Sequence, residues 1–247
     1  MYKRRYLRTD GTSSRLPTKF ATRSARRATN EEVMVDTKHI DVVDLNRNVA
    51  NNTAGVLAPA GPTLCQIAIG GSSEQREGRS VVITGVHFKG TLVLQPGNTL
   101  TASGPCCVRI ILVQDRQCNK NSTAITSAQI FTSSAVDDNV NMFMDLNQEE
   151  RFQFLYDKTY VLNPTTNLDS LGTDYPQLLK HVEFKVNTNI KIDYDQSAAT
   201  GAITTIMSNN LFFVYQTNQG WISTVANRAT PTNPVQVSAI TRVEYIG

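Results

Sequence analysis

Over residues 181–194, nearly every second side chain is apolar, and the residues between them are mainly charged or amide residues. Val182, Phe184 and Ile192 fall in the apolar series, whereas Glu183 and Lys185 fall in the polar one. Because successive side chains of a β-strand point to opposite faces of its sheet, this alternation predicts a long strand with one buried face. Three further segments alternate in the same way and are predicted as strands: residues 81–94, 151–162 and 235–245.

The alternation also predicts which side chains of these three strands are buried. In residues 81–94 we expect the buried face to hold Val82, Val86, Phe88, Leu92 and Leu94. In residues 151–162 we expect it to hold Phe152, Phe154, Tyr156, Tyr160 and Leu162. In residues 235–245 we expect it to hold Val235, Val237, Ala239, Val243 and Tyr245. One apolar face on each strand is typical of sheets that pack on a core with that face alone.

Two other segments, residues 106–113 and 211–215, are almost continuously apolar. Runs of this kind are typical of strands that are buried on both sides or lie in the centre of a sheet. Residues 38–49 and 56–69 are weaker candidates, and they bring the number of predicted strands to eight. The connections are rich in Gly, Asn, Ser, Thr and Pro, and residues 119–150 are expected to hold short helical turns rather than a long helix.

The composition supports an all-β protein. Of the 247 residues, 40% are hydrophobic, which is enough for a core, and only 18% are charged. No apolar run approaches the length of a membrane-spanning helix, and we expect no membrane insertion. No linker or internal repeat divides the strand region. We therefore predict an eight-stranded antiparallel jelly roll, a two-sheet β-sandwich, over residues 31–247, preceded by a basic N-terminal arm over residues 1–30.

Charge is distributed very unevenly along the chain. Residues 1–30 contain nine of the 24 basic residues and one of the 21 acidic residues, so this arm carries a net charge of +8 and the rest carries −5. Seven of the nine are arginines, whose guanidinium groups can each bind two phosphate oxygens. A nuclear localisation sequence or a solvated tail stays open as the alternative. The predicted nucleic-acid-binding residues are Lys3, Arg4, Arg5, Arg8, Arg15, Lys19, Arg23, Arg26 and Arg27.

The sequence contains no catalytic motif that we recognise. His39, His87 and His181 are far apart in the chain and are interpreted as ordinary strand residues. The cysteines have no C-x-x-C spacing and are interpreted as buried free thiols of a reducing compartment. These cysteines are Cys65, Cys106, Cys107 and Cys118. We therefore predict that the protein is not an enzyme and binds no cofactor.

Several polar groups in predicted loops carry no assigned chemistry. The carboxylate pairs are interpreted as solvated loop charges, with a metal ion at a subunit contact as the alternative. These pairs are Asp137/Asp138, Glu149/Glu150 and Asp193/Asp195. No role is assigned to Arg76 or Arg79, which lie in a polar loop. The first residues, MYKRRYLRTDG, lack the apolar segment of a secretory leader, so we expect a cytoplasmic or nuclear location.

Several segments, taken in order, resemble a known family. The arginine-rich N-terminus leads into KHIDV (residues 38–42), which is followed by REGRSVVITGVHFKGTL (76–92), VRIILVQDR (108–116) and RFQFLYDKTY (151–160). This ordered set resembles the capsid proteins of small circular, replication-protein-encoding single-stranded DNA viruses. It is more distantly similar to the coat proteins of geminiviruses and of satellite tobacco necrosis virus. The resemblance extends over nearly the whole chain.

The resemblance implies a function and partners. It implies one jelly roll per subunit, a closed icosahedral shell of about 60 copies, and an arm that faces inward onto single-stranded DNA, with RNA as an open alternative. We expect the protein in the virion and, during assembly, in the host nucleus, where an import receptor would bind the basic clusters at residues 3–5 and 26–27.

The sequence gives less support to two other functions. A secreted carbohydrate- or receptor-binding jelly roll is the alternative, but the arginine-rich arm does not favour it. A jelly-roll enzyme of the cupin type would need a cluster of histidines and carboxylates around a metal ion. Three isolated histidines do not supply such a cluster.

Overall fold

In the computed structural model, the described residues are 36–49, 63–94, 106–118, 125, 127–132, 140, 142–162, 179–195, 201–217 and 235–247. They contain eight β-strands and only short helical turns. The strands are β1 (Thr37–Val49), β2 (Ser80–Leu94), β3 (Cys106–Asp115), β4 (Phe152–Leu162), β5 (Leu179–Tyr194), β6 (Ile206–Ser208), β7 (Asn210–Thr217) and β8 (Val235–Ile246). The helical turns are α3 (Ser127–Ile130), η2 (Leu146–Gln148) and η3 (Ile203–Thr205).

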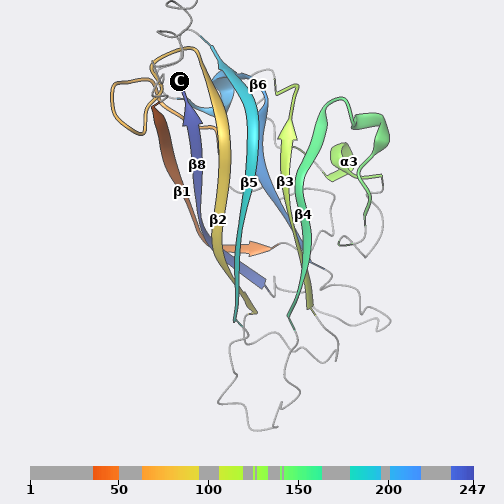
Figure 1. The fold of residues 1–247 in the computed structure, drawn as a ribbon. Helices are drawn as coiled ribbons and strands as arrows, with labels where there is room; N and C mark the ends of the chain where they lie inside the picture. The colour runs from red at the N-terminus through yellow and green to blue at the C-terminus, as the bar shows by residue number, and fades with distance from the viewer. Residues whose placement is uncertain are drawn as a thin grey trace, which may run out of the picture. The chain divides into compact units, whose positions relative to one another are not determined.

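The strands form two sheets, as predicted. One sheet has the order β1-β8-β2-β5-β6 and the other has the order β4-β3-β7. All pairings between these strands are antiparallel. Figure 1 shows β1, β8, β2 and β5 side by side, with β3 and β4 next to them and α3 beyond β4. The predicted all-β, two-sheet class is therefore confirmed, and residues Thr37–Gly247 form one compact unit.

The main core lies between the two sheets and is built from the inward faces of their strands. Alternating residues of β8, from Val235 to Tyr245, are buried in it as predicted. Inward residues of β2 and β5 join them, including Phe88, whose ring stacks on that of Phe184 with centroids 4.9 Å apart. Phe213 of β7 meets Phe88 edge-on at 5.1 Å. These aromatic contacts join the two sheets across the core.

A β-bulge corrects the predicted buried face of β2. The register of β2 shifts between Ile83 and Gly85 against both of its neighbours. Before the shift, Val81 and Ile83 are buried rather than Val82, whereas Val86, Phe88 and Leu92 point inward as predicted. The prediction for the side chain of Leu94 lies outside the described residues. The extra residue of a bulge exchanges the two faces of a strand, so the prediction for Val82 is wrong.

A second bulge divides β4 between two cores. Its pairing with β3 shifts between Leu112 and Val113, opposite Leu155. After the shift, Tyr160 and Leu162 pack in the main core, as predicted. Phe152 instead lies in a second cluster on the other side of the three-stranded sheet. The prediction that all the aromatic residues of this strand share one face is therefore wrong for Phe152 and Phe154, because the bulge reverses the side on which they emerge.

The three-stranded sheet is buried on both faces. Its outer face is covered by the segment between β3 and β4, which contains α3 and η2. Together they enclose the second cluster of buried residues: Ile111, Val113, Ile130, Phe131, Met142, Phe152, Phe212 and Val214. The interpretation of the two continuously apolar runs as strands buried on both sides is therefore confirmed, and so are the short helical turns in this segment.

The predicted strand over residues 56–69 does not form in its described part. Residues 63–69 are irregular apart from an isolated bridge between Ile69 and Arg76. Arg76 is only 1% exposed and holds this loop together. Its Nε donates to the Ile67 carbonyl at 3.0 Å, and its guanidinium lies 4.2 Å from the ring centroid of Tyr194. The role that the sequence does not give to Arg76 is therefore structural. Residues 56–62 lie outside the described residues.

Candidate interaction surfaces

The predicted nucleic-acid-binding residues all lie outside the described part of the chain, in residues 1–35. The assignment of Lys3, Arg4, Arg5, Arg8, Arg15, Lys19, Arg23, Arg26 and Arg27 therefore stays a prediction. Asp137 and Asp138 also lie outside it. Chain continuity joins the arm to β1, which begins at Thr37 and is an end strand of the five-stranded sheet. The described residues offer three surfaces on which a partner could bind.

The first surface is the outward side of the five-stranded sheet, which we call the open face. On β1, Ile40 and Val42 pack on the main core, so His39 and Asp41, which alternate with them, point outward. The same alternation on the neighbouring strands adds the other members. The open face consists of His39, Asp41, Val43, Ile240, Arg242, Glu244, His87, Lys89, His181, Glu183 and Lys185. All three histidines of the chain thus lie on it, and they are surface strand residues as predicted.

Ion pairs balance the charges of the open face. Arg242 binds both carboxylate oxygens of Asp41, at 2.8 and 2.7 Å, and this pairing holds the pKa of Asp41 below its usual range. The Glu183 carboxylate accepts from Lys89 at 3.0 Å and lies 2.9 Å from His87. These contacts lower the pKa of Glu183, and the hydrogen bond from Lys89 has the largest effect. Because each cation has a carboxylate partner, this face does not concentrate positive charge for a polyanion.

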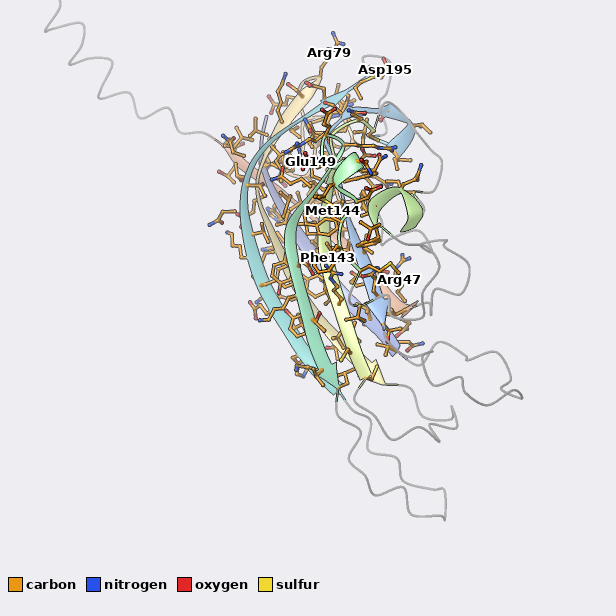
Figure 2. All side chains as sticks on the ribbon, turned by 90° about the vertical axis from the view of Figure 1, so that its right-hand side faces the viewer. Arg47, Arg79, Phe143, Met144, Glu149 and Asp195 are labelled. Atoms are coloured by element: carbon orange, nitrogen blue, oxygen red, sulfur yellow. The ribbon has the colours of Figure 1, made fainter. Side chains whose placement is uncertain are left out.

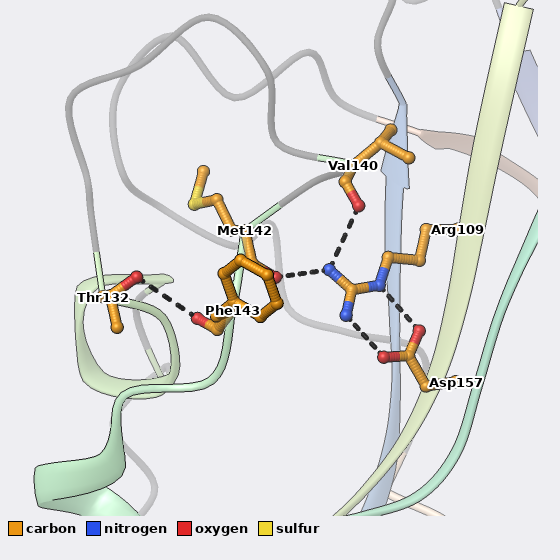
Figure 3. A network of polar contacts seen from close by, with 6 residues as sticks. All are labelled: Arg109, Thr132, Val140, Met142, Phe143 and Asp157. Atoms are coloured by element: carbon orange, nitrogen blue, oxygen red, sulfur yellow. Dashed lines mark hydrogen bonds and ion pairs between the residues drawn. The ribbon is translucent and has the colours of Figure 1, made fainter.

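The second surface is built on the segment between β3 and β4, and a buried arginine anchors it. Arg109 of β3 donates from Nε to Asp157 of β4 at 2.6 Å, and a second guanidinium nitrogen binds the other carboxylate oxygen. Its Nη1 donates to the carbonyls of Met142 at 2.6 Å and Val140 at 3.1 Å (Figure 3). One side chain therefore joins the covering segment to two strands of the sheet.

A second ion pair lies where the same segment joins the end of β3 and the start of β4. Arg151 binds the buried Asp115 carboxylate through Nε and Nη2, both at 3.0 Å, and this raises the pKa of Arg151. The backbone N–H of Arg116 donates to the Arg151 carbonyl at 2.8 Å. The Asp145 N–H donates to the Ile130 carbonyl, also at 2.8 Å, and ties the segment to α3. The described residues of the segment are thus bonded to the sheet and to one another at several points.

This braced segment presents apolar side chains to solvent. Met142 points into the second cluster, but the adjacent Phe143 is 80% exposed and Leu146 is 71% exposed. Glu149 and Glu150 follow directly and are exposed, and neither forms an ion pair with a described residue. Figure 2 shows Phe143 and Glu149 on the same side of the molecule. We call residues 143–150 the acidic knob, since Asp145 adds a third carboxylate.

The third surface lies where the far end of β4 meets the start of β5. The ammonium groups of Lys158 and Lys180 lie 5.3 and 5.7 Å from the ring centroid of Tyr160. Lys180 also donates to the Val161 carbonyl at 3.2 Å. Neither lysine is paired with a carboxylate among the described residues. Val161 and Leu179 are partly exposed there. We call Lys158, Tyr160, Val161, Leu179 and Lys180 the basic edge.

No arrangement for catalysis is visible in the described residues. No group of three or more His, Cys, Asp or Glu side chains among them is placed to hold a metal ion. None of the four cysteines is in a disulfide, and Cys65, Cys106 and Cys118 are buried as predicted, whereas Cys107 is only partly buried. Burial raises the pKa of Cys65 to about 12, so its thiol is a poor nucleophile. Within the same residues, no helix has the length and apolarity needed to cross a membrane.

Comparison with known proteins gives no family for this chain. No protein-family model matches it, and no curated protein matches it significantly. Sequence analysis noted the Glu149/Glu150 pair but missed the acidic knob and the basic edge as surfaces. The basic edge could not be found from spacing, because Lys158 and Lys180 come from different strands.

Proposed function

We propose that this protein is a viral capsid protein, in which a jelly roll forms a closed shell and the basic arm packages single-stranded nucleic acid. The observation that carries the proposal is the order of the strands. In a jelly roll, the first, eighth, third and sixth strands form one sheet, and the second, seventh, fourth and fifth form the other. If one strand lies between β1 and β2, and the three-residue β6 at the end of the sheet is left out of the count, the order β1-β8-β2-β5 and the order β7-β3-β4 both agree with this rule.

One backbone hydrogen bond to β7 also supports the jelly roll. The rule requires the second strand to pair with the free side of β7. The N–H of Leu64 donates to the carbonyl of Leu211 in β7 at 2.9 Å. Leu64 lies in the segment 56–69, whose described residues 63–69 form no strand. Leu64 therefore lies next to β7, where the rule places the second strand.

The arm supplies the nucleic-acid part of the proposal. A charge of +8 within 30 residues precedes a body with a net charge of −5, and the cations of the open face are already paired. A single strand that engaged the whole arm would release counterions, so log K would fall against log salt with a slope of about −6. Base contacts contribute little to such binding, and we expect no sequence specificity.

Deletion of residues 1–30 tests whether nucleic-acid binding depends on the arm and folding does not. We expect the shortened protein to keep the unfolding midpoint of the full chain, because every described strand lies beyond residue 36. Its affinity for a single-stranded oligonucleotide, measured by fluorescence anisotropy, should fall at least a hundredfold and lose most of its salt dependence. Replacing the nine basic residues by glutamine in the full chain is the matched control, and it should have the same effect. Unchanged affinity in both variants would contradict the assignment.

A further inference from the structure

We propose that the acidic knob of one copy docks on the basic edge of a second copy, and that this contact holds the shell together. The inference rests on the proposed shell function and names one of the interfaces that such a shell needs. Both surfaces are described above: the acidic knob is residues 143–150, and the basic edge is formed by Lys158, Tyr160, Val161, Leu179 and Lys180.

The acidic knob is built as a binding surface rather than as a loose loop. Phe143 and Leu146 are more exposed than any other large apolar side chain in the described residues. Hydrogen bonds hold the chain on both sides of the acidic knob. Arg109, which is paired with Asp157, donates to the carbonyl of Met142 before it, and Arg151 after it binds Asp115. A rigid surface loses little conformational entropy when it binds, so an exposed aromatic side chain on it is a strong anchor for a partner.

The basic edge has the complementary chemistry. The ammonium groups of Lys158 and Lys180 approach the same ring of Tyr160, and no described carboxylate neutralises either of them. Carboxylates brought in by a partner would relieve the repulsion between these lysines. Val161 and Leu179, next in sequence to Tyr160 and Lys180, are 42% and 49% exposed and add apolar surface on the other faces of β4 and β5. The acidic knob offers Glu149 and Glu150 next to its own apolar side chains.

The two surfaces of one copy are too far apart to meet each other. The acidic knob ends immediately before Arg151 and β4, and the basic edge begins near the other end of β4. Lys158, where the basic edge begins, is seven residues beyond Arg151, which is about 23 Å of extended strand. The contact must therefore join different copies. Because the two surfaces differ, it is heterologous, and a heterologous contact that closes on itself produces a ring or a shell.

Charge reversal with rescue tests this contact. Glu149→Lys with Glu150→Lys places four like charges opposite each other, and so does Lys158→Glu with Lys180→Glu. Each pair should raise the concentration needed for particle formation at least tenfold, measured by light scattering. Combining all four substitutions restores opposite charges and should recover assembly. Arg79→Glu with Lys191→Glu, which changes two exposed basic residues outside all three surfaces, is the matched control and should assemble like the natural chain.

The possible outcomes separate this inference from the proposed function. If the natural chain forms no particles, the shell proposal itself fails. If it forms particles and both reversed pairs do so at the same concentration, the shell stands and this contact is wrong. If the lysine reversal weakens oligonucleotide binding but leaves assembly unchanged, the basic edge binds nucleic acid instead, and the inference is overturned. Phe143→Ser with Leu146→Ser is a second probe that changes no charge and should also impair assembly.

Discussion

The two sheets bury their strands to different extents, although both are antiparallel and share one core. The five-stranded sheet packs on that core with one face and leaves the open face to solvent, where exposed ion pairs lie on it. The three-stranded sheet is covered on its outer face as well, by the segment between β3 and β4. Arg109 lies under this cover and is bound on all sides, whereas Arg242 on the open face has one exposed partner. Arginine–carboxylate pairs of similar geometry should therefore differ greatly in their contribution to stability.

Removing the buried arginine should have the largest effect. Arg109→Ala leaves Asp157 without its partner and frees the carbonyls of Val140 and Met142, so we expect it to lower the free energy of unfolding by about 4 kcal/mol. Arg242→Ala on the open face is the matched control and should leave the urea midpoint nearly unchanged, because its ion pair is exposed to water. Equal loss of stability in the two variants would show that the cover does not distinguish the sheets.

A substitution in the second cluster should have the next largest effect on stability. Ile111 points into the second cluster and is fully buried, so Ile111→Ala should cost about 3 kcal/mol of unfolding free energy, measured by urea denaturation. Ile240→Ala removes the same atoms from the open face, where half of the side chain is exposed, and should cost less than about 1 kcal/mol. If Ile111→Ala costs no more than Ile240→Ala, the covering segment contributes no real core.

Acid should lower the stability of the protein by a smaller amount, through the ion pairs of the open face. Asp41 and Glu183 have pKa values below their usual range because of Arg242 and Lys89, respectively. A lowered carboxyl pKa stabilises the fold above the pKa of the unfolded chain, and this contribution is lost as the pH falls through the lowered value. The urea midpoint should therefore drop between pH 5 and pH 3. The drop should be smaller in a variant carrying Asp41→Asn and Glu183→Gln, and an identical drop would contradict the assignment.

The sequence predicted the class of fold well because burial on one face leaves a clear period of two, as in β5 and β8. The bulges could not be predicted in the same way. Val81, Val82 and Ile83 are all β-branched and apolar, so the pattern does not say which of them points inward. Leu155 between two aromatic residues hides the second bulge equally well.

The candidate surfaces were predictable only where the residues are adjacent in the chain. The basic arm is evident from its composition, and Glu149/Glu150 is a visible pair. Arg109 lies within an apolar run, and its partner Asp157 is 48 residues away, so their pairing depends on the register of β3 and β4. Lys158 and Lys180 converge on one tyrosine for the same reason. Contacts of this type are produced by the fold and leave no local pattern.

The molar mass of the purified protein in solution shows most directly whether it forms a shell. Light scattering combined with size-exclusion chromatography, with and without single-stranded DNA, measures the molar mass of the assembly across salt and pH. We predict closed particles of about 60 copies. The measured molar mass should fall when the charge of the acidic knob is reversed. A stable monomer of 27.3 kDa under all of these conditions would contradict the proposed shell.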